Sequence, residues 1–393
     1  MFATRLERSE KEKRRKRFTT PISLVAGQAT PNVLAVMDKA IRPVEVILCT
    51  TDDMHENSEI LKRYFTQHQI RCREVKLGNA YDFAALQEKF LELATELEDK
   101  ASEVGVNLAG GTKLMTIAAQ QFFWQKFTCF YINPEQNSIQ YISEKDAPEY
   151  PIAGQLKIKD FFAIHGYRVI SSKEKQVSEK PEQLEKTEQL CRELITGYSR
   201  YGEALRTLNF LAGEAKQTLS VRNNIPEKSW TLLELFQDYG AIHYYDDRKV
   251  QFADEESRRF CQGFWLEEWV GCALKELNHQ VKLQDYASSI VIESEKGTRN
   301  EIDAAFLYNN RLYLIECKTA NLEAEDKSAP PLYKLDSLHN LPGIFTQKVL
   351  VSYLPLDSHG KKRAEELKIE VIEKDRLLGL ATSLGNLLKS KER

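Results

Sequence analysis

Two neighbouring apolar segments of this chain carry acidic residues and a lysine at their outer ends. The stretch at 300–320 reads NEIDAAFLYNNRLYLIECKTA, and two asparagines separate the apolar segments. Asparagine tolerates the positive φ of two-residue hairpin turns, although the usual glycine is missing. We therefore expect a hairpin with strands at 301–308 and 311–318, in which Tyr308 faces Arg311.

This register brings four charged side chains to one face of the hairpin. Asp303 faces Glu316 and Glu301 faces Lys318, because directly opposite residues of an antiparallel pair point to the same side. Two opposed carboxylates, with Cβ atoms about 5 Å apart, repel each other unless a cation lies beside them. A divalent cation satisfies this need, and all-oxygen ligands favour Mg²⁺ or Mn²⁺ over zinc. The alternative is a solvent-facing hairpin with an ordinary Glu301–Lys318 ion pair.

The aspartate followed by the Glu-Cys-Lys sequence at 316–318 resembles the PD-(D/E)xK nuclease superfamily, although the proline of that name is absent. The likeness covers about residues 255–380. It implies a restriction-endonuclease-like α/β fold in which Asp303 and Glu316 bind metal. It also implies that Lys318 orients the attacking water or stabilises the charge that develops on the phosphate.

In that superfamily a glutamate on an upstream helix usually completes the site. The segment GFWLEEWVGCALKEL at 263–277 is expected to be helical and offers two adjacent glutamates. By resemblance to the family's G-x-W-L-E pattern we favour Glu267 as a catalytic residue and metal ligand. Glu268, or a plain surface role, is the alternative. Glu301 is expected to support the site, as an outer ligand or as the partner of Lys318.

The first half of the chain alternates apolar strands with amphipathic helices. This pattern predicts a mainly parallel sheet with helices on both faces. The expected strands lie at 21–27, 44–51, 72–77, 104–111, 128–133 and 138–143, and the expected helices at 30–40, 56–67, 81–100 and 112–125.

Three strand ends in this half carry polar residues, and ligands of such sheets sit outside the carboxyl ends of the strands. The third, NLAGGTK at 107–113, has two glycines that let backbone approach a ligand and a helix start that attracts anions. It is neither a dinucleotide fingerprint nor a P-loop. A tight strand-to-helix turn without a ligand is the alternative.

The segments NLAGGTKLM (107–115) and GQATPNVLAVM (27–37) resemble the CARF domain, the CRISPR-associated Rossmann fold, over about residues 20–165. The resemblance implies a domain that dimerises and binds cyclic oligoadenylates across its two-fold axis. It implies a pocket lined by Gln28, Thr30, Asn32, Thr50, Asn107, Gly110, Gly111, Thr112 and Lys113.

A charged linker at 171–189, helices at 190–212 and 229–240, and a hairpin at 241–254 connect the two halves. Helices followed by a two-stranded wing resemble a winged helix, and a structural spacer is the alternative. We therefore divide the chain into four parts. They are a basic N-terminal arm (1–20), a sensor domain (21–168), a linker and winged-helix-like connector (169–254) and a nuclease domain (255–393).

Composition limits the class of protein. The 393 residues have a net charge of −3, so any contact with nucleic acid depends on local basic patches. One such patch is KEKRRKR in the N-terminal arm. It is either a phosphate-binding arm or a solvated terminus. The seven cysteines form no CxxC pair. No apolar run approaches the roughly 20 residues that span a bilayer, and the N-terminus does not resemble a signal peptide. We expect a cytoplasmic protein without membrane contact.

The two resemblances together match the ancillary nucleases of type III CRISPR systems that cyclic oligoadenylates activate. They imply a homodimeric, Mn²⁺- or Mg²⁺-dependent endonuclease that cyclic tetra-adenylate switches on, with the linker passing the change to the nuclease domain. Its substrate would be single-stranded DNA, RNA or supercoiled DNA. The alternatives are a repair or restriction nuclease without a messenger, and a non-enzymatic regulator that senses a ligand and binds DNA.

Overall fold

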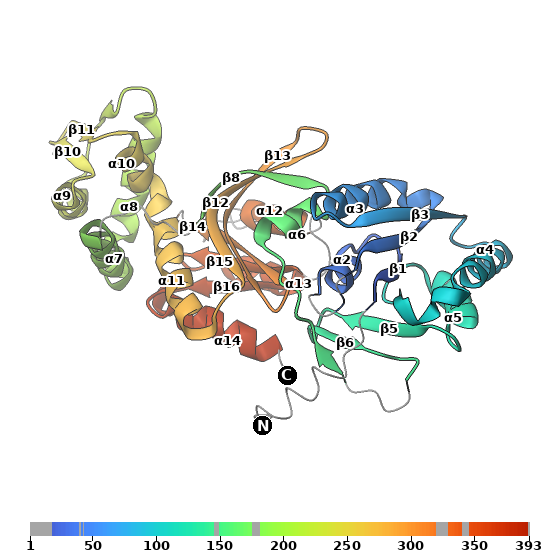
Figure 1. Cartoon of the computed structure of the whole chain (residues 1–393). Helices are drawn as coiled ribbons and strands as arrows, with labels where there is room; N and C mark the ends of the chain where they lie inside the picture. The colour runs from blue at the N-terminus through green and yellow to red at the C-terminus, as the bar shows by residue number, and fades with distance from the viewer. Residues whose placement is uncertain are drawn as a thin grey trace.

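The structure is a computed structural model that describes residues 18–38, 41, 43–144, 149–174, 181–319, 329–339 and 346–391. Residues 1–17 of the expected basic arm lie outside the described residues. Three parts lie in a row in Figure 1, with the C-terminal sheet between the N-terminal domain and the connector. None of the helices in the described parts of the chain is long and apolar enough to cross a membrane.

The N-terminal domain is the expected parallel sheet with helices on both faces. Its order is β3-β2-β1-β4-β5-β6-β7, and the first five strands run parallel. The strands are β1 (Thr20–Leu24), β2 (Glu45–Thr51), β3 (Arg71–Gly78), β4 (Val104–Asn107), β5 (Thr128–Asn133), β6 (Ser138–Gln140) and β7 (Tyr150–Pro151). The helices are α2 (Thr30–Met37), α3 (His55–Gln67), α4 (Phe83–Glu96) and α5 (Lys113–Phe123).

Alternate residues of β2 show how the helices divide between the two faces. Ile47 and Cys49 belong to the core cluster of α4 and α5, whereas Val46 and Leu48 belong to that of α2 and α3. A strand buried on both faces reads as a continuous apolar run, as this one does.

The connector contains helices and a small sheet of order β10-β11-β9. The single helix expected at 190–212 is two helices, separated at Gly197. A Cβ at Gly197 would lie 2.5 Å from the Tyr201 ring. The expected wing is present, because β10 and β11 pair antiparallel after α9 ends at Gly240, whose φ is +97°. The elements are α7 (Pro181–Thr196), α8 (Tyr198–Glu214), β9 (Ser220–Arg222), α9 (Trp230–Tyr239), β10 (Ile242–Tyr245), β11 (Lys249–Phe252) and α10 (Glu255–Arg259).

The C-terminal sheet has the order β16-β15-β14-β13-β12-β8. Its strands are β8 (Tyr167–Glu174), β12 (Asp285–Ser294), β13 (Arg299–Tyr308), β14 (Arg311–Lys318), β15 (Thr346–Ser352) and β16 (Ile369–Glu373). Its helices are α6 (Ile158–Ala163), α11 (Trp265–Val281), α12 (Ala329–His339), α13 (Ser358–Glu366) and α14 (Leu380–Lys391). The strand β8 corrects the expected boundary at residue 169, because it pairs with β12 and belongs to this sheet rather than to a linker.

Helices cover both faces of this sheet, as Figure 1 shows. On one face α11, α14 and the connector helices pack against Phe306, Tyr313 and Ile315. On the other face α12 packs against Leu312 and Leu314, in a core cluster that continues into α2 and α3 of the N-terminal domain. The N-terminal domain and the C-terminal sheet therefore share one buried surface.

The register expected for the hairpin β13–β14 is confirmed. Tyr308 pairs with Arg311, and the ladder continues to Ala304 opposite Ile315. The turn residues Asn309 and Asn310 have φ values of +50° and +56°. Positive φ at both central positions is the requirement of the hairpin turns that match strand twist.

Candidate functional site

Asp303 and Glu316 lie side by side on the sheet face that α12 covers. Their side chains are buried, with residue exposures of 7% and 1%. Asp303 Oδ2 accepts a hydrogen bond of 2.7 Å from the backbone N–H of Cys317, so this carboxylate takes the place of a main-chain acceptor where the ladder ends. Burial and the charge of Glu316 raise the pKa of Asp303 to about 6. This pair is the one that the hairpin register predicts.

Two lysines balance the charge of this carboxylate pair. Lys318 Nζ lies 2.7 Å from Glu316 Oε1 in an ion pair. Lys334 Nζ, from α12, lies 2.5 Å from Glu316 Oε2 and 3.7 Å from Asp303 Oδ1. Burial lowers the pKa of Lys318, but the attraction of Glu316 outweighs it and the net pKa is raised. Lys334 could not be predicted from the sequence, because no motif or register links it to the hairpin.

Glu301 does not pair with Lys318, which is one of the two roles that we expected for it. Its side chain is exposed, and among the described residues no ion pair joins it to Lys318, which pairs with Glu316 instead. Glu301 acts on the site through its charge, which helps to raise the pKa of Glu267.

Glu267 lies on α11 and approaches the site from the end of β14. The turn before α11 includes Gly263, with φ +123°, where a Cβ would lie 2.4 Å from Thr319 Oγ1. Only glycine permits this approach of the helix to the strand end. Burial, then Asp303 and Glu301, raise the pKa of Glu267 to about 8, and Lys318 opposes the shift. The neighbouring Glu268 instead acts through its charge on the thiol of Cys191.

The carboxylates suit a divalent cation. Glu267 Oε2 is buried and has no hydrogen-bond partner among the described residues, and each oxygen of Glu316 lies beside a lysine ammonium. Mg²⁺ is commonly held by one or two carboxylates and waters, so Asp303 and Glu316 are sufficient. The three carboxylates do not converge fully, because α11 packs on the opposite face of the sheet.

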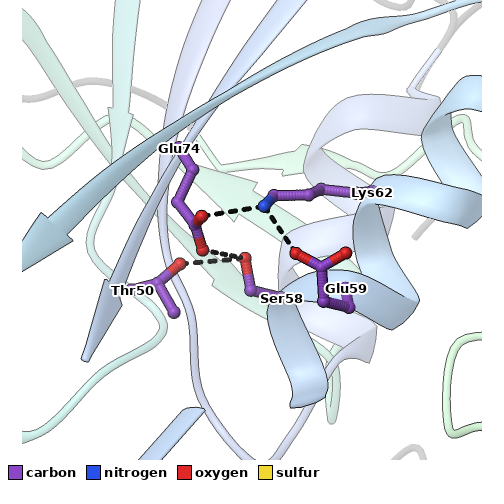
Figure 2. A network of polar contacts seen from close by, with 5 residues as sticks. All are labelled: Thr50, Ser58, Glu59, Lys62 and Glu74. Atoms are coloured by element: carbon purple, nitrogen blue, oxygen red, sulfur yellow. Dashed lines mark hydrogen bonds and ion pairs between the residues drawn. The ribbon is translucent and has the colours of Figure 1, made fainter. Parts of the chain in front are cut away.

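Within the described chain, the set of three acidic or histidine side chains whose ligand atoms lie within 4.8 Å of one another is His55, Glu59 and Glu74. Lys62 donates to both glutamates there, at 2.7 and 2.8 Å (Figure 2). The hydrogen bond from Lys62 lowers the pKa of Glu74. This cluster is therefore an ion-pair network in which Lys62 already offsets one of the two negative charges.

Thr50, an expected ligand residue, belongs to the same network. It is buried, and its hydroxyl donates to Ser58 Oγ at 3.0 Å, which in turn donates to Glu74 at 2.9 Å (Figure 2). Thr50 therefore links β2 to α3, and Ser58 links α3 to β3.

Several other expected ligand residues hold the strand-end loops together. Asn32 donates from Nδ2 to Leu24 O at 3.0 Å, and Asn107 donates to Pro31 O at 3.2 Å. Thr30, also expected in the pocket, is fully buried, and its hydroxyl has no hydrogen-bond partner in the described parts of the chain. Asn32 and Asn107 therefore position the edge where the strands end.

The two glycines of the third loop have separate structural reasons. A Cβ at Gly110 would lie 2.1 Å from Leu24 O, and Gly111 has φ +73°. Thr112 caps α5 by accepting the Met115 N–H at 3.2 Å, and it donates to Ala80 O at 3.2 Å. The loop therefore positions the start of α5 at the edge where the strands end, and Lys113 is exposed there. Gln28, on the loop after β1, is half-buried.

Comparison with known proteins identifies a domain family in each half of the chain. The family model of the Card1 CARF domain matches residues 20–161, and that of the Card1-like endonuclease domain matches residues 254–390. No curated protein matches the chain.

Three solved structures share the fold. Protein VC1899 from Vibrio cholerae is 23% identical, covering 95% of this chain and 98% of that one, with a TM-score of 0.84. Can2 from Sulfobacillus thermosulfidooxidans, in complex with cyclic tetra-adenylate, is 24% identical over 95% and 98% of the chains, with a TM-score of 0.76. A type III CRISPR defence DNA nuclease activated by cyclic oligoadenylate is 16% identical over 87% and 46%, with a TM-score of 0.56. The chain therefore joins a Card1 CARF domain to a Card1-like endonuclease domain.

Proposed function

We propose that this chain is a metal-dependent endonuclease that acts inside the cell in type III CRISPR defence and is activated by cyclic tetra-adenylate. The observation that carries the nuclease activity is the buried Asp303–Glu316 pair, which two lysines contact. The relatives support the activator, because Can2 is described as bound to cyclic tetra-adenylate and another as a nuclease activated by cyclic oligoadenylate.

In this mechanism Asp303 and Glu316 would hold Mn²⁺ or Mg²⁺, and Glu267 on α11 would be an additional carboxylate near them. When bound, such an ion would polarise the scissile phosphate and lower the pKa of the attacking water. Lys318, fixed against Glu316, orients that water or stabilises the charge that develops on phosphorus. The raised pKa of Glu267 means that, without metal, this side chain carries a proton near neutral pH.

The sensor site lies where the N-terminal strands end. The start of α5 offers unpaired N–H groups and a positive dipole end, and Lys113 adds a charge. A symmetric ring of phosphates suits two copies of this loop, so the active form is a homodimer with the ligand on its two-fold axis. Gln28 and the backbone of Gly110 and Gly111 line the same edge.

The function is tested by incubating the protein with Mn²⁺ and labelled single-stranded DNA, RNA or supercoiled plasmid, with and without cyclic tetra-adenylate. We expect cleavage that depends on the ligand and is lost in Glu316→Ala. Lys113→Ala should weaken ligand binding, whereas Lys126→Ala, an exposed lysine paired with Glu98, should not.

The outcomes separate the alternatives. Cleavage without ligand would indicate a messenger-independent repair or restriction nuclease. Ligand binding without cleavage of any substrate would indicate a regulator. A full ligand response in Lys113→Ala would contradict the sensor site.

A further inference from the structure

Lys334 bridges the two carboxylates on which the proposed metal site depends. Its Nζ lies 2.5 Å from Glu316 Oε2 and 3.7 Å from Asp303 Oδ1, whereas the ion pair of Lys318 within the described residues is with Glu316. Two neighbouring buried carboxylates cannot both stay ionised without a cation near them. The ammonium of Lys334 thus lies where a divalent ion that bridges Asp303 Oδ1 and Glu316 Oε2 would lie.

The position of Lys334 is built into the fold. On α12, Leu332, Leu335 and Leu338 are buried against the sheet. Asp336, two residues after Lys334, pairs at 2.7 Å with Lys348 of β15, and Lys348 is only 7% exposed. A buried ion pair is a weak source of stability but fixes the geometry of the elements that carry it.

The strand that carries Lys348 lies beside the one that carries Glu316. In the β14–β15 ladder, Glu316 pairs with Leu350 and Leu314 pairs with Lys348. The Lys348–Asp336 pair is therefore anchored on the strand adjacent to the site. It fixes the position of α12 relative to the sheet, so that Lys334 contacts both Asp303 and Glu316.

We propose that Lys334 is an internal cation that occupies the metal position of the metal-free enzyme and that Mn²⁺ or Mg²⁺ must displace. It keeps Asp303 and Glu316 ionised and in place before the metal arrives, at a cost in metal affinity. It is a positioning residue, and the proposal rests on the metal-dependent function proposed above.

The test is the affinity for Mn²⁺, measured by calorimetry on the full-length protein without nucleic acid. Lys334→Met removes the competing charge, so its dissociation constant should fall by about tenfold or more. Its melting temperature in EDTA should also fall, because the carboxylates then lack their bridging cation. Lys334→Arg keeps the charge and should bind Mn²⁺ about as weakly as the wild type.

The control variant is Lys361→Met. Lys361 is a half-exposed lysine of α13 that pairs at 2.8 Å with Glu373, away from Asp303 and Glu316. It should change neither the Mn²⁺ affinity nor the stability in EDTA. If Lys334→Met folds poorly, Lys334→Gln removes the charge while keeping donors for the carboxylates, and it too should bind Mn²⁺ more tightly.

An unchanged or weaker Mn²⁺ affinity in the neutral variants, with cleavage still present in the wild type, would overturn the role of Lys334 alone. If the wild type and the neutral variants all failed to bind Mn²⁺, both this role and the metal-dependent function would be wrong.

Discussion

Asn310, in the turn of the hairpin that carries Asp303 and Glu316, donates a hydrogen bond of 2.7 Å to Asn137 of the N-terminal domain. It also donates to Gly154 O at 2.9 Å and accepts from Leu156 N at 3.1 Å. Asn310 is only 2% exposed. The hairpin that bears the nuclease carboxylates is therefore anchored in the sensor domain at its turn.

This contact suggests a direct route between the proposed sites. We expected the linker to pass the effect of the ligand to the nuclease domain. In the structure, the C-terminal sheet meets the N-terminal domain through a shared core and through Asn310, while the connector packs on α11 over the opposite face. A strand pair is stiff along its length, so a shift at the turn can reach Asp303 and Glu316.

The first prediction concerns this contact. Asn310→Gly keeps the positive φ of the turn but removes the side-chain hydrogen bonds, so the stimulation of cleavage by cyclic tetra-adenylate should fall severalfold. Ligand affinity, measured separately, should change much less. The matched control is Asn309→Gly, at the exposed neighbouring turn position with the same sign of φ. Equal stimulation in both variants would show that Asn310 only stabilises the fold.

The second prediction distinguishes the carboxylates of the site. Glu316→Gln removes a buried charge that two lysines contact, so the cleavage rate should fall by about a thousandfold or more. Glu301→Gln changes an exposed residue that acts only through charge, and we expect a loss of less than about tenfold. Single-turnover rates in Mn²⁺ measure both, with circular dichroism to confirm folding. A larger loss in Glu301→Gln would make Glu301 a direct ligand.

The hairpin shows why part of the site was predictable from the sequence. Two consecutive asparagines define a two-residue turn, and turn length fixes register, so Asp303 opposite Glu316 followed by counting. Lys334 was not predictable in this way. It reaches the carboxylates from a separate helix, and its distance depends on how Leu332 and the Lys348–Asp336 pair place α12.

The strand-end loops of the N-terminal domain show what the sequence could not predict. The sequence identified the strand-end loops, but residue type alone does not separate a side chain that faces a ligand from one that holds the loop. Asn32 and Asn107 are polar because they satisfy buried carbonyl groups. The strand β8 was missed as part of the C-terminal sheet, because pairing between distant segments leaves no local pattern.

The third prediction tests the close backbone contact beneath the sensor edge. In Gly110→Ala the added Cβ would lie 2.1 Å from Leu24 O, which is too close for two non-bonded atoms. The strand β1 and the loop must therefore move apart. We expect a loss of roughly 2 kcal/mol or more in stability and weaker ligand binding. Gly27→Ala, on the neighbouring loop with nothing within 4 Å of the added Cβ, is the control for both measurements. A stable Gly110→Ala protein would contradict this contact.

The fourth prediction is a pH dependence of stability that arises at the junction between α6 and β8. His165 is half-buried, with Nδ1 2.8 Å from Phe161 O and a buried Nε2 that has no partner among the described residues, and desolvation lowers the pKa of its imidazole to about 4. An unfolded histidine has a pKa of about 6.5, so between these values the unfolded chain binds a proton that the folded chain does not. Stability must therefore fall as the pH drops through this window, by roughly 3 kcal/mol in total from this residue.

The measurement is the melting temperature at pH 7 and at pH 4.5. His165→Gln cannot titrate, so its melting temperature should fall less between these two values than that of the wild type, even if it is less stable at pH 7. His279→Gln, at an exposed position on α11, should show the full wild-type drop. Because other groups also titrate in acid, the difference between the two variants, rather than the drop itself, reports on His165. Equal drops in all three proteins would mean that His165 is solvated or charged in the folded state.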